Sequence, residues 1–219
     1  MWLEPVYLVP EGEAPENAEY MVFAVVFEEE DWAELGVNGD SLECNSVYFG
    51  KNEFSVFRMK LSDPLYLHRF YAENSALLKE RYWRSVTRNR FVRDTVQSVP
   101  EIFSDFTRSC QNKGIYDFFE PLDNKESVIR EENEEEVEPH QLVCLKSKFG
   151  FIQGRIPFRL YAVEVDVDCF IITGGAIKIV EEMTQAPNTR LELKKLEYVL
   201  NELIDAGISN KKNLLDFII

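Results

Sequence analysis

The sequence is poor in the residues that build common metal sites. It contains only two histidines, His68 and His140, and its four cysteines lie far apart with no Cys-x-x-Cys pair. A zinc site needs Cys and His ligands at short spacing, so no metal is expected. Isolated cysteines of this kind are typical of reduced thiols in a cytoplasmic protein, and no cofactor is predicted.

Several motifs of nucleotide-binding proteins and hydrolases are also missing. The chain has no Gly-x-Gly-x-x-Gly after a predicted strand, no P-loop and no Gly-x-Ser-x-Gly turn. A Ser/His/acid triad would have to take its histidine from a helix surface or an acidic loop. Carboxylate pairs are frequent, but acidic runs are usually solvated, so no pair is singled out as a catalytic centre.

Long hydrophobic runs are absent. No segment approaches the ~18–20 apolar residues of a membrane span. The first ten residues are apolar but include Glu4 and no basic residue, so no secretory signal and no membrane attachment are predicted. With 219 residues, of which 45% are hydrophobic and 13% aromatic, the composition is that of a globular protein. We expect a single domain over residues 1–219.

Charge is distributed unevenly along the chain. The net charge is −15, yet residues 56–113 contain 11 basic and 6 acidic side chains. Residues 1–55 contain 13 acidic and one basic side chain, and residues 114–140 contain 10 acidic and two basic ones. A net-acidic surface repels nucleic acid at long range. The basic segment could bind phosphate locally, or it could pair with the acidic segments of the same chain.

The hydrophobic pattern in the first half predicts strands followed by helices. Residues 20–27 form a continuous apolar run typical of a buried strand. Residues 46–49 and 53–61 flank Gly50-Lys51-Asn52, and residues 54–59 alternate between the two faces of a strand. This pattern predicts a hairpin, so residues 1–61 form a strand and hairpin extension. Residues 62–120 are predicted as helices that begin at Asp63-Pro64, with an interruption at Pro100 before a further helix over 101–111.

The second half predicts an acidic loop followed by a sheet and helices. Residues 121–140 have the composition of a loop. Strands are expected over 142–148, 158–167 and 169–173, the last two antiparallel, with Gly174-Gly175 ending the sheet. Thr189 and Glu192 match a capping box that opens a helix over 190–206, which Gly207 ends, and a short helix follows over 211–219. Segregated helices and antiparallel strands define an α+β fold.

The candidate catalytic residues lie in this last third. Arg159 and Tyr161 share one face of the predicted strand, and Arg155 and Lys178 flank the strand pair. Arginine can hold a phosphate and stabilise its developing charge, and a lysine or tyrosine can move a proton if neighbouring cations lower its pKa. RNA cleavage without a metal is one interpretation. The other is that Tyr161 is a core residue and that the cations are solvated surface residues.

A basic and aromatic segment over residues 79–93 is a second candidate site. Arg81, Arg84 and Arg88 fall on one helical face, and Tyr82 and Trp83 lie among them. Such a face suits phosphate contact and base stacking, so these arginines are candidates for nucleic-acid binding. The same face could dock against the acidic run at 131–138 or against an acidic partner protein.

The segment from Arg155 to about residue 204 resembles the C-terminal half of RelE/ParE-superfamily toxins, in particular their HigB-like, phage-derived branch. The resemblance rests on Gly154-Arg155, on Phe158-Arg159-Leu160-Tyr161, and on Lys178 after Ile-Ile-Thr-Gly-Gly and before a leucine-striped helix. It implies a RelE/ParE-like core and a metal-independent, ribosome-dependent mRNA endonuclease from a bacterial toxin–antitoxin pair. Arg155, Arg159, Tyr161 and Lys178 then fall on the family's basic strand and turn, and the expected partners are an antitoxin and the ribosome with its mRNA.

The acidity and length of the chain favour a different hypothesis. Members of the resembled family are usually basic and about half as long, whereas this chain has acidic segments at 1–55 and 121–140. The alternative function is therefore a non-catalytic protein-interaction or regulatory module from a phage or mobile element. An acidic mimic of nucleic acid is a third possibility, although a mimic usually lacks a basic middle segment.

Overall fold

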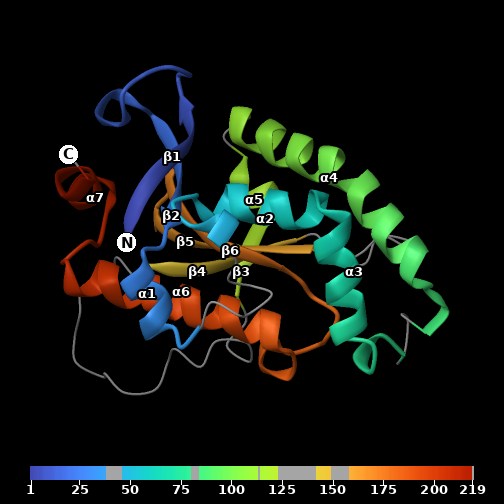
Figure 1. The fold of residues 1–219 in the computed structure, drawn as a ribbon. Helices are drawn as coiled ribbons and strands as arrows, with labels where there is room; N and C mark the ends of the chain where they lie inside the picture. Colours follow the sequence, from blue (N-terminus) through green and yellow to red (C-terminus); the bar gives the residue numbers. More distant parts are fainter. Residues whose placement is uncertain (38–45, 80–83, 113, 123–141, 149–157, 219) are drawn as a thin grey trace.

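A six-stranded sheet forms the centre of the computed structural model, which describes residues 1–37, 46–79, 84–112, 114–122, 142–148 and 158–218. The strand order is β1-β2-β6-β5-β4-β3. The strands are β1 (Trp2–Val9), β2 (Tyr20–Val26), β3 (Phe119–Pro121), β4 (Val143–Ser147), β5 (Phe158–Asp166) and β6 (Cys169–Ile177). Only β2 and β6 pair in parallel, and the other neighbours are antiparallel. The predicted α+β class is confirmed (Figure 1).

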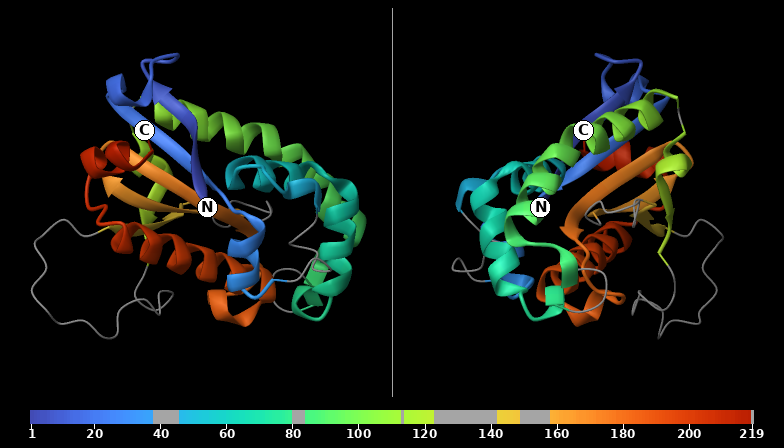
Figure 2. Two further views of the ribbon diagram at one scale, coloured as in Figure 1. Left: turned by 60° about the vertical axis from the view of Figure 1, so that its left-hand side comes forward. Right: turned by 90° about the vertical axis from the view of Figure 1, so that its right-hand side faces the viewer.

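Helices cover both faces of the sheet (Figures 1 and 2). One face packs against α2 (Glu53–Ser62), α3 (Pro64–Glu73), α4 (Arg88–Gln111) and α5 (Ile115–Phe118). The other packs against α1 (Glu29–Glu34), α6 (Pro187–Asp205) and α7 (Lys211–Ile218). Short 3-10 turns occur at η1 (Pro15–Asn17), η2 (Ser46–Tyr48), η3 (Leu77–Lys79) and η5 (Met183–Gln185). Among the described residues, no helix combines the length and the apolar character that a membrane crossing requires.

The core is divided into two layers by the sheet. Along β5, Leu160 and Ala162 belong to the cluster under α2, α3 and α4, whereas Tyr161 and Val163 belong to the cluster under α6. This alternation agrees with the predicted faces of the strand, because successive side chains of a strand point to opposite sides. Every residue of β6 is buried. Each fully buried aliphatic or phenylalanine side chain contributes roughly 1.5–3 kcal/mol, so the two layers supply most of the stabilisation.

Several predicted elements are confirmed. The buried strand at 20–27 is β2, the strands at 142–148 and 158–167 are β4 and β5, and β5 pairs antiparallel with β6 across the turn at Asp166–Cys169. The Asp63 carboxylate accepts a hydrogen bond from the backbone N–H of Leu65 at 2.8 Å, as expected of an N-cap residue before Pro64. The leucine stripe of α6 is buried, and α7 begins at Lys211.

The hairpin predicted over 46–61 is wrong. Residues 46–48 form η2 and residues 53–62 form α2. The side chain of Asn52 accepts a hydrogen bond from Ser55 N at 2.8 Å and starts the helix. Val56, Phe57 and Leu61 are buried and recur at helical spacing. Because the segment is short, its apolar residues fit a period of 2 and a period of 3.6 equally well, and only the contact with β6 decides between them.

Three predicted boundaries are also wrong. Pro100 does not interrupt α4, which is continuous over Arg88–Gln111; the proline ring lies on the exposed side of the helix, where it meets no core packing. The sheet does not end at Gly174-Gly175, because β6 continues to Ile177. Thr189 and Glu192 form no capping box: α6 starts at Pro187, and the Thr189 hydroxyl donates to the carbonyl oxygens of Met183 (2.7 Å) and Ala186 (3.1 Å).

The first segment of the chain contains two elements that the pattern did not predict. β1 is an edge strand that pairs with β2, and α1 follows β2 directly. β2 lies between β1 and β6, so residues 1–26 belong to the sheet itself rather than to an extension beside it. Most of the predicted acidic loop, residues 123–140, lies outside the described residues.

Candidate functional site

Two of the predicted catalytic residues lie at the same end of the β5–β6 pair. Arg159 is the register partner of Ala176, and Lys178 follows Ala176 by two residues, just beyond the end of β6. The guanidinium of Arg159 donates a hydrogen bond to the carbonyl oxygen of Ser147 on β4. Its Nε is buried and has no hydrogen-bond partner among the described residues. Both side chains are half-buried, and Arg155 lies outside the described residues.

Tyr161 lies deeper on the same strand. Its side chain is 1% exposed and packs within the cluster under α6. Gly174 is its register partner on β6. From this position the phenol does not reach a ligand at the surface, so the structure brings Arg159 and Lys178 to one end of the sheet and leaves Tyr161 in the core.

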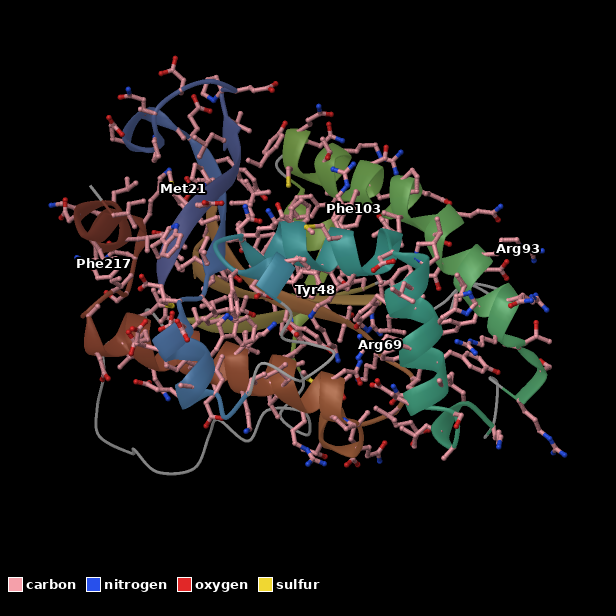
Figure 3. All side chains as sticks on the ribbon, viewed as in Figure 1. Met21, Tyr48, Arg69, Arg93, Phe103 and Phe217 are labelled. Atoms are coloured by element: carbon pink, nitrogen blue, oxygen red, sulfur yellow. The ribbon has the colours of Figure 1, made fainter. Side chains whose placement is uncertain are left out.

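A group of exposed arginines, which we call the arginine face, surrounds the start of α4. It consists of Arg84, Arg88, Arg90 and Arg93. Within the described residues, Asp94 is the only carboxylate ion-paired with it, at 3.2 Å from Arg90 and 3.0 Å from Arg93. Figure 3 shows Arg93 at the edge of the molecule, whereas Phe103 points into the core. Of the three predicted nucleic-acid contacts, Arg84 and Arg88 lie on this face, and Arg81 falls outside the described residues.

The arginine face has an unfavourable position in its helix. The N-terminus of α4 has a partial positive charge from its unpaired backbone N–H groups, and Thr87 caps only one of them, by accepting from Arg90 N at 3.4 Å. Cations there oppose the helix dipole. Arginines and helix terminus therefore add to one local positive potential, which attracts anionic groups.

A buried charge cluster, which we call the Glu–Lys–Glu cluster, was not predicted. It consists of Glu53 at the start of α2 and of Glu192 and Lys195 on α6. Lys195 Nζ lies 2.8 Å from Glu53 Oε2 and 3.0 Å from Glu192 Oε1. Burial raises the pKa of Glu192 to about 7, although the charge of Lys195 opposes this. Burial also acts to lower the pKa of Lys195, but the two carboxylates outweigh it and raise that pKa.

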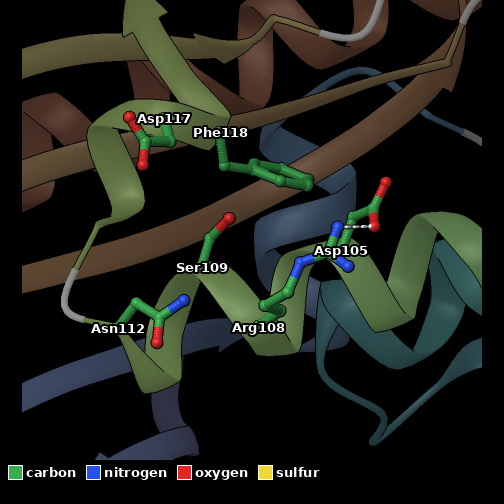
Figure 4. A pocket seen from close by; sticks show the side chains of 6 residues that line it. All are labelled: Asp105, Arg108, Ser109, Asn112, Asp117 and Phe118. Atoms are coloured by element: carbon green, nitrogen blue, oxygen red, sulfur yellow. Dashed lines mark hydrogen bonds and ion pairs between the residues drawn. The ribbon is translucent and has the colours of Figure 1, made fainter.

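A small pocket lies between the C-terminal end of α4 and α5 (Figure 4). It is lined by Asp105, Arg108, Ser109, Asn112, Asp117 and Phe118. Arg108 is already ion-paired with Asp105. The second carboxylate, Asp117, leaves the lining net acidic, so the pocket does not match the cationic phosphate site expected from the sequence.

Among the described residues, no group of three or more His, Cys, Asp or Glu side chains is placed to hold a metal ion. Comparisons of the chain with protein-family models, with curated proteins and with solved structures gave no match.

Proposed function

We propose that the chain is a non-catalytic interaction module whose arginine face binds an acidic patch on a partner protein. The exposure of Arg84, Arg88, Arg90 and Arg93, with Asp94 as the one described ion-pair partner, is the observation that carries this proposal. Cations at a helix N-terminus cost stability, typically a few tenths of a kcal/mol each at the surface, so contact with an anion offsets an intrinsic disadvantage.

An acidic protein patch fits better than an extended nucleic acid. Guanidinium groups bind carboxylates with two parallel hydrogen bonds, and a compact acidic patch can be confined to the arginine face. A nucleic-acid strand would extend beyond it into the field of a protein with a net charge of −15. At physiological salt, screening limits the attraction of these arginines to about 8 Å.

Binding to defined polyanions tests this function. We expect the full chain to bind polyglutamate at low salt, more tightly than a single-stranded RNA oligonucleotide of equal charge. The double variant Arg88→Gln/Arg93→Gln should lose at least tenfold in affinity. Arg108→Gln, at the other end of the same helix and paired with Asp105, is the matched control and should bind like the unmodified protein. Equal binding by both variants, or tighter binding of RNA, would contradict the proposal.

A toxin-like, metal-independent mRNA endonuclease is the second candidate function. It is supported by the position of Arg159 and Lys178 at one end of the β5–β6 pair and by the buried Arg159 Nε, which has no hydrogen-bond partner among the described residues. An antitoxin and the ribosome would be its partners. Induced expression in a bacterial host should then arrest growth, and Arg159→Ala should relieve the arrest. Undiminished growth on expression of the unmodified chain counts against this function.

A further inference from the structure

The Glu–Lys–Glu cluster lies where the parallel strand pair ends. β2 pairs with β6 from Met21 to Ala24, opposite Cys169 to Ile172, whereas β6 continues to Ile177. Beyond this pairing, α2 and α6 approach from opposite faces of the sheet, and Lys195 of α6 reaches Glu53 of α2. The cluster is therefore a direct link between the two helical layers.

The cluster has more negative than positive groups and no access to water. Its three side chains are between 0% and 3% exposed. Two carboxylates share one ammonium, and Glu192 Oε2 is buried without a hydrogen-bond partner among the described residues. An anionic oxygen in this position loses its hydration without compensation, which costs more free energy than a neutral carboxyl group in the same place.

In the part of the chain that the structure describes, few other groups can balance this charge. On α2, the charge of Lys60 also acts on Glu192, and that lysine is itself buried among the rings of Tyr48 and Tyr66. On the α1 side, the rings of Trp32 and Phe27 face Lys195 at 5.0 and 5.9 Å from the ammonium. On β6, Gly174 leaves the space that Glu192 occupies, since a Cβ there would lie 1.9 Å from Glu192 Oε2.

We propose that Glu192 holds a proton in the folded protein below neutral pH, and that its ionisation loosens the contact between α6 and α2, so that the Glu–Lys–Glu cluster is a pH-sensitive junction. With the proton present, Glu53 and Lys195 form a neutral pair. Without it, the enclosed charge is that of two carboxylates on one ammonium, and opening of α6 lets water hydrate Glu192. Burial raises the pKa of Glu192, which agrees with the protonated carboxyl group that this geometry favours.

The sign of the effect follows from linkage. Glu192 has an ordinary pKa of 4.5 in the unfolded chain and a pKa of about 7 in the folded protein. The folded state therefore binds the proton more tightly, and the junction weakens as the pH rises from about 5 to above 7. This proposal does not depend on the arginine face.

Carboxyl NMR and hydrogen exchange of the full chain test the proposal. The side-chain carboxyl carbon of Glu192, assigned by its disappearance in Glu192→Gln, should titrate with a midpoint between pH 6 and 8. After correction for intrinsic exchange, the backbone amides of α6 near Glu192 should exchange roughly thirtyfold faster at pH 8.5 than at pH 5.5, because Glu192 has a pKa of 4.5 in the opened state and about 7 in the closed state. Glu192→Gln should abolish this increase.

The matched control is Glu197→Gln, which removes an exposed carboxylate from the same helix and should leave the pH dependence intact. If Glu192→Gln does not fold, assignment through neighbouring resonances still gives the midpoint in the unmodified protein. A midpoint below pH 5, or an opening rate that is independent of pH, would overturn the proposal.

Discussion

The ammonium of Lys195 lies 2.8 Å from the carboxylate of Glu53, although the two residues are 142 positions apart in the chain. Their contact joins the first turn of α2 to the middle of α6 past the end of β2. Both side chains are removed from solvent, so the pair gives up its hydration completely. A buried ion pair of this kind contributes little net stability but makes the loss of either partner costly.

Replacing Lys195 by methionine is therefore expected to destabilise the protein strongly. Lys195→Met removes the ammonium that both Glu53 and Glu192 contact, and the expected loss is about 3–5 kcal/mol in the free energy of unfolding. Adding Glu53→Gln and Glu192→Gln to this variant removes the uncompensated charge and should restore a large part of the loss. Urea unfolding at pH 7 measures the stability of the single variant and of the triple variant. A single variant as stable as the unmodified protein would show that the cluster is not closed to water.

The same cluster shows why part of the molecule could not be predicted. Glu192 and Thr189 have the spacing of a capping box, and local sequence gives no reason to prefer another role. Only the approach of α2 and β6 shows that Glu192 points inward, and α2 lies more than a hundred positions away in the chain. Strands and helices with a strong period, such as β5 and α6, were predictable because their pattern is local.

The burial of Tyr161 is a second feature that the local pattern could not predict. The alternation along β5 correctly placed Arg159 and Tyr161 on one face, but it could not show that α6 covers that face. The pattern of a strand with apolar residues on both sides does not by itself show whether helices cover one face of the sheet or both faces. The sequence therefore identified the strand and its faces, while the burial of Tyr161 depended on the tertiary arrangement.

Gly175 is expected to tolerate no side chain. A Cβ at this position would lie 2.8 Å from ring carbons of Phe57 and 3.0 Å from the carbonyl oxygen of Arg159. Gly175→Ala should therefore force β6 and α2 apart and cost about 1–3 kcal/mol in the free energy of unfolding. Gly114→Ala is the control, because its nearest neighbour is the movable side chain of Asp117. Thermal unfolding compares the two, and equal midpoints would contradict the close packing of α2 on β6.

Two cysteines should be protected from thiol reagents. Cys110 and Cys169 are 0% exposed, and burial raises the pKa of each thiol to about 12. Because the thiolate is the reactive form, neither should be alkylated by iodoacetamide at pH 8 while the protein is folded. Cys144 is only half-buried and serves as an internal comparison. Peptide mapping by mass spectrometry, before and after unfolding in guanidinium, gives the result. Rapid labelling of Cys110 in the native protein would contradict the packing of α4 against the sheet.

Asp31 should make a stabilising contribution that depends on pH. Its carboxylate lies 3.0 Å from the Met1 ammonium and accepts hydrogen bonds from Tyr198 Oη at 2.6 Å and from Glu28 N at 2.6 Å. Burial acts to raise the pKa of Asp31, but these donors outweigh it and lower that pKa below its ordinary value of 3.8. The stabilisation is thus present above about pH 4 and is lost as the pH falls through the folded-state pKa.

The free energy of unfolding of the variant Asp31→Asn should accordingly be about 1–3 kcal/mol lower at pH 7, as expected when a charged hydrogen-bond acceptor is removed. The difference between Asp31→Asn and the unmodified protein should shrink as the pH falls from about 4 through the lowered folded-state pKa of Asp31, because the carboxyl group is then protonated. Tyr198→Phe removes one donor but keeps the ion pair with Met1, so it should lose less at pH 7 than Asp31→Asn. Urea unfolding from pH 3 to pH 8 measures the three proteins. A constant difference between Asp31→Asn and the unmodified protein over this range would show that Asp31 is not charged in the folded state.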